Sequence, residues 1–353
     1  PLALGATLYV PGNRADLART IERRFANGVT SMVIDLEDAV ADDEEDHAAA
    51  CAVAALDELA DGPAAAMLLF VRTRTPERIP KIAAELGPGR TALSGFVLPK
   101  FTSAIARDGL DAVVRASEVL GKHLYAMPVL ESPEIVYRET RDIELGSIAE
   151  ILGEYRSHVL AARIGATDMC GMFGIRRDRD LTIYDVRVAA DAIASIINYL
   201  GRAGDAGHII TGPVWEYFAD HERLFRPTLR QTLFADHDAV LFRQHLVSRD
   251  IDGLLREIAL DRANGMHGKT VIHPTHVAAV HALSAVTHEE YHDAVDIAGG
   301  DAGGVRTSTY RNKMNELKPH RRWAQGVLDR AHVFGVTNPN ITFVDLLTAL
   351  VPA

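Results

Sequence analysis

The chain has 353 residues, a formal net charge of -11 at pH 7, 48% hydrophobic residues and 24% charged residues, which is ordinary for a globular protein. The acidic balance argues against a nucleic-acid partner, because such binding depends on basic patches. Cys51 and Cys170 form no disulfide framework and have no metal-ligand spacing. With no apolar run of membrane-spanning length and no signal-peptide pattern, we expect a cytoplasmic protein without a membrane partner.

Apolar, β-rich runs alternate along the chain with runs rich in Ala, Leu, Glu and Arg. The predicted strands cover 6–10, 31–36, 66–72, 94–99, 124–130, 158–165, 206–211 and 269–273. The predicted helices between them include 14–27, 45–60, 103–120, 134–152 and 185–202. This alternation is typical of a parallel sheet, and eight units would close a (β/α)₈ TIM barrel of the α/β class. A doubly wound open sheet is the alternative, but polar residues follow many different strands here rather than gathering at one crevice.

The barrel domain is predicted to span 1–283, with an insertion near 212–250 that is too long for a simple loop. The segment 284–353 is predicted to be a C-terminal helical extension that acts as a lid or in oligomerisation. The glycine-rich run 299–304 resembles a hinge. The apolar end 343–351 has few polar residues, so it either forms an interface or folds back on its own barrel.

An apolar run from Met32 to Ile34 leads directly into three acids, Asp35, Glu37 and Asp38. Carboxylates this close repel one another unless something offsets their charge, and a bound Mg²⁺ is a common solution. In a barrel, these acids would lie at the carboxyl end of a strand, where active sites are found. An acidic helix start is the alternative, since 42–46 is also acidic.

A distinctive residue also lies at or just after the end of each other predicted strand, except the seventh. These residues are Gly12, Arg72 with Arg74, Lys100, Glu131, Asp168 and, after the eighth strand, His273. Together they would surround the barrel mouth with acids for a metal and bases for an anionic substrate.

At this point the chain resembles the HpcH/HpaI aldolase and citrate lyase beta-subunit superfamily. The matching motifs, in the order of the family, are LYVPGN, VIDLEDAV, FVRTR, FVLPK, PVLESP, IGATDM and GKTVIHP. The resemblance implies a TIM barrel with a Mg²⁺-dependent carbon–carbon lyase or aldolase activity on an α-keto acid or a β-hydroxy acyl substrate, often a coenzyme A thioester, through a metal-stabilised enolate. It also implies a homo-trimer or homo-hexamer in which the C-terminal segment packs on a neighbour.

The resemblance also assigns roles to individual residues. Glu131 and Asp168 correspond to the Mg²⁺ ligands, and Arg72 to the arginine that holds the substrate carboxylate and carbonyl. Glu37 and Asp38 correspond to acids that hold metal-bound water. We place Arg74, Lys100 and Gly12 with Arg72 in substrate binding, because they lie beside these positions in the motifs.

The sequence departs from the family pattern at several points. Gly5-Ala6 replaces the usual Arg-Ser pair, and Thr275-His276 replaces the Gln that usually follows IHP. Together with the diverged tail, the first change leaves coenzyme A recognition open. Arg74 stands where Asn is common, which favours a more anionic substrate.

Each assignment has a structural alternative. Glu131 and Asp168 could cap the helices that follow them. Arg72 could pair with Asp35 or Glu37 inside the barrel, and Lys100 could simply lie on the rim. We expect His273 to hydrogen-bond within the barrel and Cys170 to pack.

Two other functions also remain open. The first is a Mg²⁺-dependent hydrolase or phosphotransferase that uses Arg74, Arg176, Arg177 and Arg179 for a phosphorylated ligand. The second is a non-catalytic barrel subunit.

Overall fold

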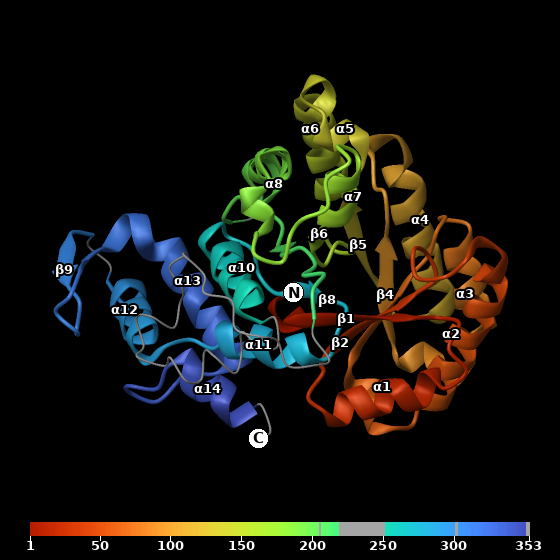
Figure 1. Ribbon diagram of the computed structural model, residues 1–353, viewed down its shortest axis with the longest axis horizontal. Coiled ribbons are helices and arrows are strands. Elements are labelled where there is room, and N and C mark those ends of the chain that lie inside the picture. The colour runs from red at the N-terminus through yellow and green to blue at the C-terminus, as the bar shows by residue number, and fades with distance from the viewer. Residues whose placement is uncertain (205, 219–250, 301–302, 351–353) are drawn as a thin grey trace.

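The computed structural model describes residues 1–204, 206–218, 251–300 and 303–350 (Figure 1). Its centre is a parallel sheet with the strand order β7-β6-β5-β4-β3-β2-β1-β8. The strands are β1 (Ala6–Pro11), β2 (Ser31–Asp35), β3 (Leu68–Arg72), β4 (Leu93–Leu98), β5 (Tyr125–Leu130), β6 (Ala162–Ile164), β7 (Ile210–Thr211) and β8 (Lys269–Val271).

The two ends of this sheet meet, so the strands form a barrel. An isolated parallel bridge joins Gly212, just after β7, to Lys269 of β8. The amide of Gly212 donates to the carbonyl of Gly268, and its carbonyl accepts from the amide of Thr270, each over 3.1 Å. The predicted TIM barrel is therefore confirmed.

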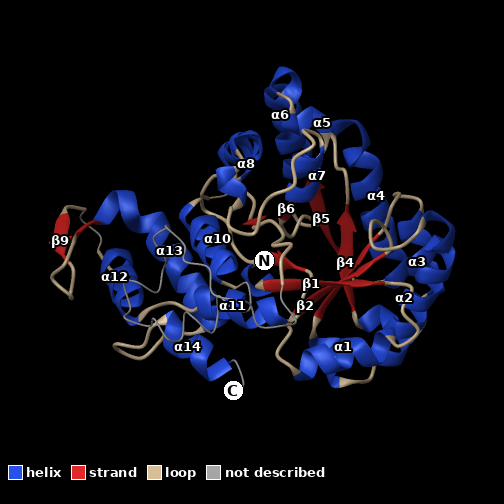
Figure 2. Cartoon of the chain, in the orientation of Figure 1, coloured by secondary structure: helices blue, strands red, loops and turns tan. Residues whose placement is uncertain are grey.

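Helices cover the outside of the barrel (Figure 2). They are α1 (Leu17–Ala26), α2 (Glu45–Leu59), α3 (Arg78–Glu85), α4 (Ser103–Leu120), α5 (Pro133–Val136), α6 (Arg138–Glu154), α7 (Ala166–Gly171), α8 (Arg187–Leu200), α10 (Asp252–Ala263) and α11 (Thr275–Ser284). Short 3₁₀ helices cover Leu2–Leu4, Asp42–Glu44, Pro63–Ala66, Pro88–Thr91 and Ile183–Asp185. Every residue of β2 is buried, because the barrel interior lies on one side and helices lie on the other.

The C-terminal extension contains α12 (His288–Ala298), the hairpin β9 (Val305–Thr307) with β10 (Met314–Glu316), α13 (Leu317–Phe334) and α14 (Phe343–Leu350). Helices α12 and α13 pack together, and α14 packs on α11. Val344 and Leu347 of α14 are buried in the main core. At these residues the apolar end folds back on its own barrel, which is the second of the two alternatives expected for it, and packing on a neighbouring subunit stays a prediction.

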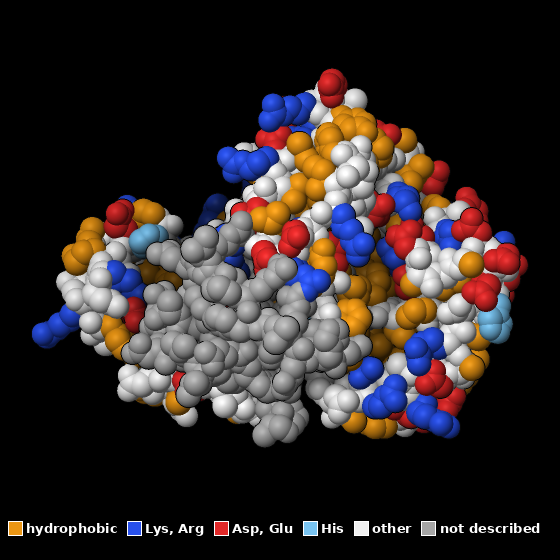
Figure 3. All heavy atoms as spheres, in the orientation of Figure 1, with side chains coloured by type: hydrophobic (Ala, Val, Ile, Leu, Met, Phe, Trp, Pro, Cys, Tyr) orange, Lys and Arg blue, Asp and Glu red, His pale blue; other side chains and the backbone are white. Residues whose placement is uncertain are grey.

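Two predicted features lie partly outside the described residues. They are the insertion near 212–250, of which 219–250 is not described, and the glycine-rich run, of which 301–302 is not described. The domain boundary at 283/284 stays a prediction. Within the described ranges, each helix is too short or too polar to cross a bilayer. On the face seen in Figure 3, acidic and basic side chains are interspersed around α2 and α3.

Candidate active site

The site begins with an ion pair between two neighbouring strands. Asp35 and Arg72 are paired residues in the register of β2 and β3, and each is the last residue of its strand. Arg72 donates through Nε to Oδ1 of Asp35 and through Nη2 to Oδ2, both over 2.6 Å. Burial alone would lower the pKa of Arg72, but the hydrogen bonds and charge of Asp35 hold that pKa above its usual value. The guanidinium is therefore a permanent cation in a fixed orientation.

Asp35 also organises the acidic loop that follows it. Its carboxylate accepts from the backbone amide of Glu37 over 3.1 Å and from that of Ala39 over 3.2 Å. With only 2% of its surface exposed, Asp35 needs these donors to offset the loss of water. Arg72 thus pairs with Asp35 inside the barrel, as the structural alternative for this residue expected. This pair uses two of its three guanidinium nitrogens and leaves the third for other contacts.

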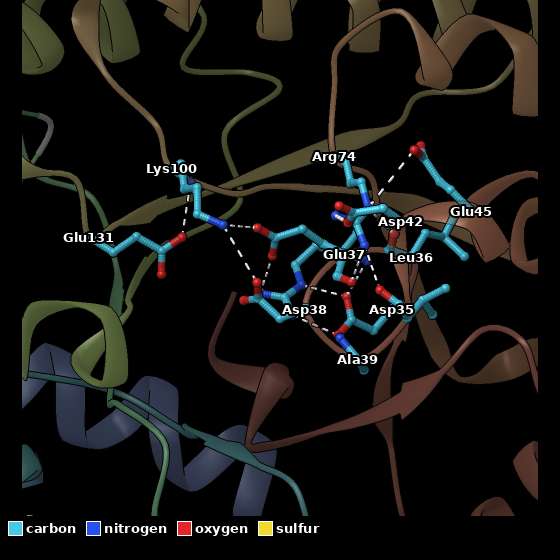
Figure 4. Close-up of polar contacts among 12 residues, drawn as sticks. Asp35, Leu36, Glu37, Asp38, Ala39, Asp42, Glu45, Arg74, Lys100 and Glu131 are labelled. Carbon is cyan, nitrogen blue, oxygen red and sulfur yellow. Dashed lines mark hydrogen bonds and ion pairs between the residues drawn. The ribbon is translucent and has the colours of Figure 1, made fainter. Parts of the chain in front are cut away.

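That third nitrogen, Nη1 of Arg72, faces the acidic loop 36–42, whose Glu37 and Asp38 are labelled in Figure 4. It lies 2.8 Å from Oε2 of Glu37 and 3.4 Å from Oδ2 of Asp38. Lys100 contacts the other oxygen of Glu37 and lies 3.5 Å from Oδ1 of Asp38. Two acids and two cations thus meet above β2, β3 and β4.

The two acids of this group have opposite pKa shifts. Burial raises the pKa of Glu37 more than Arg72 and Lys100 lower it. Asp38 is more exposed, so the charges of Arg72 and Lys100 outweigh its partial burial and lower its pKa. A proton near this site would therefore reside on Glu37 rather than on Asp38.

The carboxylate of Glu131 lies beside Lys100, a member of the same charged group. It follows β5 and is 3% exposed, and its Oε1 accepts from the backbone amide of Lys100 over 2.9 Å. Lys100 itself has a positive φ of 48°, so the chain turns sharply where it presents this amide. Glu131 therefore binds the backbone at the end of a neighbouring strand rather than the helix that follows it.

Asp168 lies in the first turn of α7, directly after β6. Burial and, to a smaller extent, the negative charge of Asp168 raise the pKa of Glu131 to about 8. The two carboxylates therefore interact, and no cation among the described residues fully offsets the negative charge of Glu131.

This donor set fits a hard divalent cation. Within the described ranges, no group of three or more His, Cys, Asp and Glu side chains is arranged to hold a metal. A Mg²⁺ bound by Glu131 and Asp168 would thus complete its shell with water or substrate oxygens, which is how Mg²⁺ is usually bound.

Two glycines make room for these acids. A Cβ on Gly165 would lie 1.8 Å from Oε2 of Glu131. A Cβ on Gly12 would lie 2.4 Å from Cδ2 of Leu36, and the amide of Gly12 donates to the carbonyl of Asp35 over 2.8 Å. Gly12 therefore supports the acidic strand end through its backbone.

Arg74 lies on the outer side of the acidic loop. It donates to the carbonyls of Leu36 and Glu37 over 3.2 and 2.9 Å, contacts that of Val40, and pairs with Asp42 over 2.6 Å. Its guanidinium thus holds the loop together, and its predicted role in substrate binding stays a prediction.

The structure adds two barrel-interior residues that the sequence did not single out. The ring of Tyr9 lies between the guanidinium carbons of Arg72 and Arg163, at 5.3 and 5.4 Å from its centroid. Arg163 is 1% exposed, and burial lowers its pKa. Its position in a short apolar strand was the only available signal, since a charge there must face the interior or the helices.

Other predicted residues have structural roles. Arg177 is buried and pairs with Glu257, which also binds Lys269. His273 bonds through Nδ1 to the hydroxyl of Thr275 over 2.7 Å. Cys170 is buried in the core, as expected.

The sequence matches the family described as C-C bond lyase of the TIM-barrel fold over residues 1–336, and the chain belongs to that family of enzymes. No protein with a curated description matches it significantly in sequence.

Among solved structures, a citrate lyase from Burkholderia xenovorans LB400 is 15% identical, with a TM-score of 0.63, over 98% of this chain and 96% of that one. The protein CitE of Mycobacterium tuberculosis, in complex with magnesium, acetoacetate and coenzyme A, is 18% identical over 94% of this chain and 100% of that one, with a TM-score of 0.58. A Haloferax volcanii malate synthase complex with magnesium and glyoxylate is 14% identical over 79% and 75%, with a TM-score of 0.56. At these identities the likeness shows the fold, and the family resemblance expected from the motifs is confirmed by the family match.

Proposed function

We propose that this enzyme is a Mg²⁺-dependent carbon–carbon lyase that acts at the barrel mouth on a carboxylate-bearing α-keto acid or β-hydroxy acyl substrate. The observation that carries the proposal is the placement of Glu131, which is buried against the amide of Lys100 and against Gly165, near enough to Asp168 that burial and then the charge of Asp168 raise the pKa of Glu131 to about 8. Such a pair is stable as two anions only when a cation joins it.

The protein side chains divide the remaining work. Glu131 and Asp168 would hold Mg²⁺, which would polarise the substrate carbonyl and stabilise an enolate. Arg72 is oriented by Asp35 through two of its nitrogens, so Nη1, which contacts Glu37 in this structure, is the nitrogen that would turn to a substrate carboxylate. Glu37 and Asp38 would orient water, and Lys100 pairs with Glu37, which partly offsets the effect of burial on the pKa of Glu37.

Two relatives support the substrate class. The CitE protein and the malate synthase were solved with magnesium and with acetoacetate or glyoxylate, small molecules that combine a carboxylate with a second carbonyl. Arg72 would suit the carboxylate of such a ligand, because Asp35 holds its guanidinium in a fixed orientation and leaves Nη1 outside that pair. The burial of Arg177 removes one reason to favour a phosphorylated substrate.

The first test is Mg²⁺ binding, measured by calorimetry and by thermal shift. Glu131→Gln and Asp168→Asn should each weaken Mg²⁺ binding at least about tenfold, because one of two anionic ligands is lost. Asp108→Asn, at an exposed position on α4, is the matched control and should bind as the unmodified protein does. Equal Mg²⁺ binding by all four proteins would overturn the proposed metal site.

The second test is a ligand screen of acetoacetate, oxaloacetate, glyoxylate and acyl-coenzyme A thioesters, with and without Mg²⁺. We expect a keto acid to raise the melting temperature only when Mg²⁺ is present. Stabilisation that is independent of Mg²⁺, or that persists in Asp168→Asn, would contradict the proposal.

A further inference from the structure

A cavity lies on the opposite face of the barrel from the acids. It has a volume of about 730 Å³ and is bordered by residues 201–204 and 207–209, which precede β7, and by 263–267, which precede β8. Helix α13 forms its outer wall. Because these loops precede their strands, the cavity belongs to the amino-terminal face, away from the face where barrels carry out chemistry. Its size is that of a small-molecule site.

The cavity gathers positive charge. Arg202, Arg262, Arg322 and Arg330 line it, and Glu290 is the single acid among its described lining residues. Glu290 pairs with both Arg262 and Arg330, over 2.9 and 3.1 Å. One carboxylate thus serves two guanidinium groups, in a chain whose net charge is -11.

The remaining two arginines are held by backbone carbonyls rather than by acids. Arg322 donates to the carbonyl of Ala203 over 3.0 Å, and Arg202 donates to that of Asn198 over 2.8 Å. These contacts fix the side chains without neutralising them, so an anion in the cavity would find oriented guanidinium groups.

Two buried nitrogen atoms of the cavity lining make no hydrogen bond within the described part of the chain. Nε of Arg330 and Nε2 of His208 are buried and have no hydrogen-bond partner among the described residues. Burial lowers the pKa of Arg330, and the nearby charge of Arg262 lowers it further, so these two cations destabilise one another. A bound anion would accept hydrogen bonds from the buried nitrogens and would offset the repulsion between Arg330 and Arg262.

The rest of the lining suits an apolar group. Leu283, Val327 and the half-exposed Trp323 line the cavity together with several glycines, which leave space for a flat moiety. Such a site has clustered cations at one part and an aromatic wall at another. It would recognise a molecule that carries both an anionic group and a flat apolar group.

We propose that this cavity binds a small organic phosphate, with the phosphate among Arg202, Arg322 and Arg330 and the apolar moiety against Trp323. A phosphate is favoured over a single carboxylate because it carries about -1.5 to -2 charge at pH 7 and three acceptor oxygens, which matches several guanidinium groups. This site is separate from the one at the barrel mouth and does not depend on the function proposed for it.

The test uses adenosine 5′-monophosphate as the probe, in buffer without divalent cations, with adenosine and benzoate as matched ligands. Calorimetry should show binding of the monophosphate, and at least tenfold weaker binding of adenosine, which lacks the anion, and of benzoate, which has one carboxylate. Inorganic phosphate should compete with the monophosphate. Equal affinity for adenosine, or tighter binding of benzoate, would overturn the assignment of a phosphate.

Amino-acid variants test whether the monophosphate binds in this cavity. Arg322→Gln and the double variant Arg202→Gln/Arg322→Gln change exposed side chains, so they should fold, and the double variant should bind the monophosphate at least about tenfold more weakly. Arg115→Gln, an exposed arginine on α4, is the charge-matched control and should leave binding unchanged. Asp168→Asn should also leave it unchanged. A loss in Asp168→Asn without a loss in the double variant would place the ligand at the barrel mouth and overturn the proposal.

Discussion

Arg72 shows how one side chain joins two strands and a loop. Its pairing with Asp35 follows the register of β2 and β3, so the contact forms as soon as the two strands align. The remaining nitrogen points at Glu37 and Asp38. A lysine at this position would keep the charge but would lose the planar fork.

We expect Arg72→Lys to lower kcat/KM about 100-fold on the substrate found by the ligand screen, because a preorganised donor is lost. Mg²⁺ binding should change little, since Arg72 does not belong to the proposed ligands. Steady-state kinetics and calorimetry measure the two effects. Arg78→Lys, which alters a partly exposed pair with Glu45, is the control and should retain activity. Full activity in Arg72→Lys would remove this side chain from the site.

Gly165→Ala should displace Glu131, because the new Cβ would lie 1.8 Å from its carboxylate oxygen. We expect weaker Mg²⁺ binding and a loss of a few kcal/mol of unfolding free energy, measured by denaturant titration. Gly146→Ala on α6 meets open space and should stabilise the protein by up to about 1 kcal/mol. Similar behaviour of the two variants would show that the contact with Glu131 is unimportant.

At the scale of elements, the sequence predicted every barrel strand, with errors at the ends. Strand β6 covers Ala162–Ile164, although the predicted strand 158–165 is longer, because only its later part forms continuous ladders with β5 and β7, while Val159 forms an isolated bridge. The predicted helix 134–152 is divided into α5 and α6 at Tyr137, whose backbone is extended. Apolar patterns do not encode such a local break.

The site was predictable only in part for a related reason. Acids and bases that follow apolar runs can be placed at strand ends from the sequence. The sequence does not show which of these side chains pair with one another, because pairing depends on strand register and on side-chain direction. Arg74 illustrates this, since it follows the same strand as Arg72 and yet holds loop carbonyls. Tyr9 and Arg163 were missed because one strand cannot show which of its residues face the interior.

Helix α14 offers a test of the extension. Leu347 is 1% exposed and contributes to the main core, so Leu347→Ala should lower the free energy of unfolding by about 2–5 kcal/mol. Val333→Ala, at a position on α13 that is 40% exposed, should cost less than about 0.5 kcal/mol. Urea denaturation measures both. If Leu347→Ala were as stable as the control, α14 would not be docked on the barrel in solution.

At the scale of the whole molecule, stability should depend on pH through His276, which is 1% exposed. Burial, together with the charges of His273 and Lys269, lowers its pKa to about 4, against 6.5 ordinarily. The unfolded chain therefore binds this proton more readily than the folded protein does, so the contribution of His276 to stability is present above pH 6.5 and is lost as pH falls toward 4.

The corresponding variant is His276→Gln. Between pH 7 and pH 5 it should lose about 2 kcal/mol less unfolding free energy than the unmodified protein. His47→Gln, at an exposed position, should follow the unmodified protein. Parallel pH profiles for all three proteins would contradict a neutral, buried His276.

We also predict a homo-oligomer, a trimer or a hexamer, on the basis of the family resemblance. The burial of Val344 and Leu347 removes one argument for it, so other surfaces of the chain must supply the contacts. Light scattering over a wide concentration range measures the subunit number. A monomer at every concentration would contradict the prediction.

The two arginines that follow β3 have a consequence for exchanging parts between barrels. The acidic loop 36–42 is held by Arg72 and Arg74, which belong to the next strand and its loop rather than to the strand that precedes it. A chimera that received 36–42 alone would inherit the acids without their cations. The smallest transferable unit is therefore two consecutive βα modules, and recombination breakpoints between residues 36 and 74 should be poorly tolerated in a library of shuffled relatives.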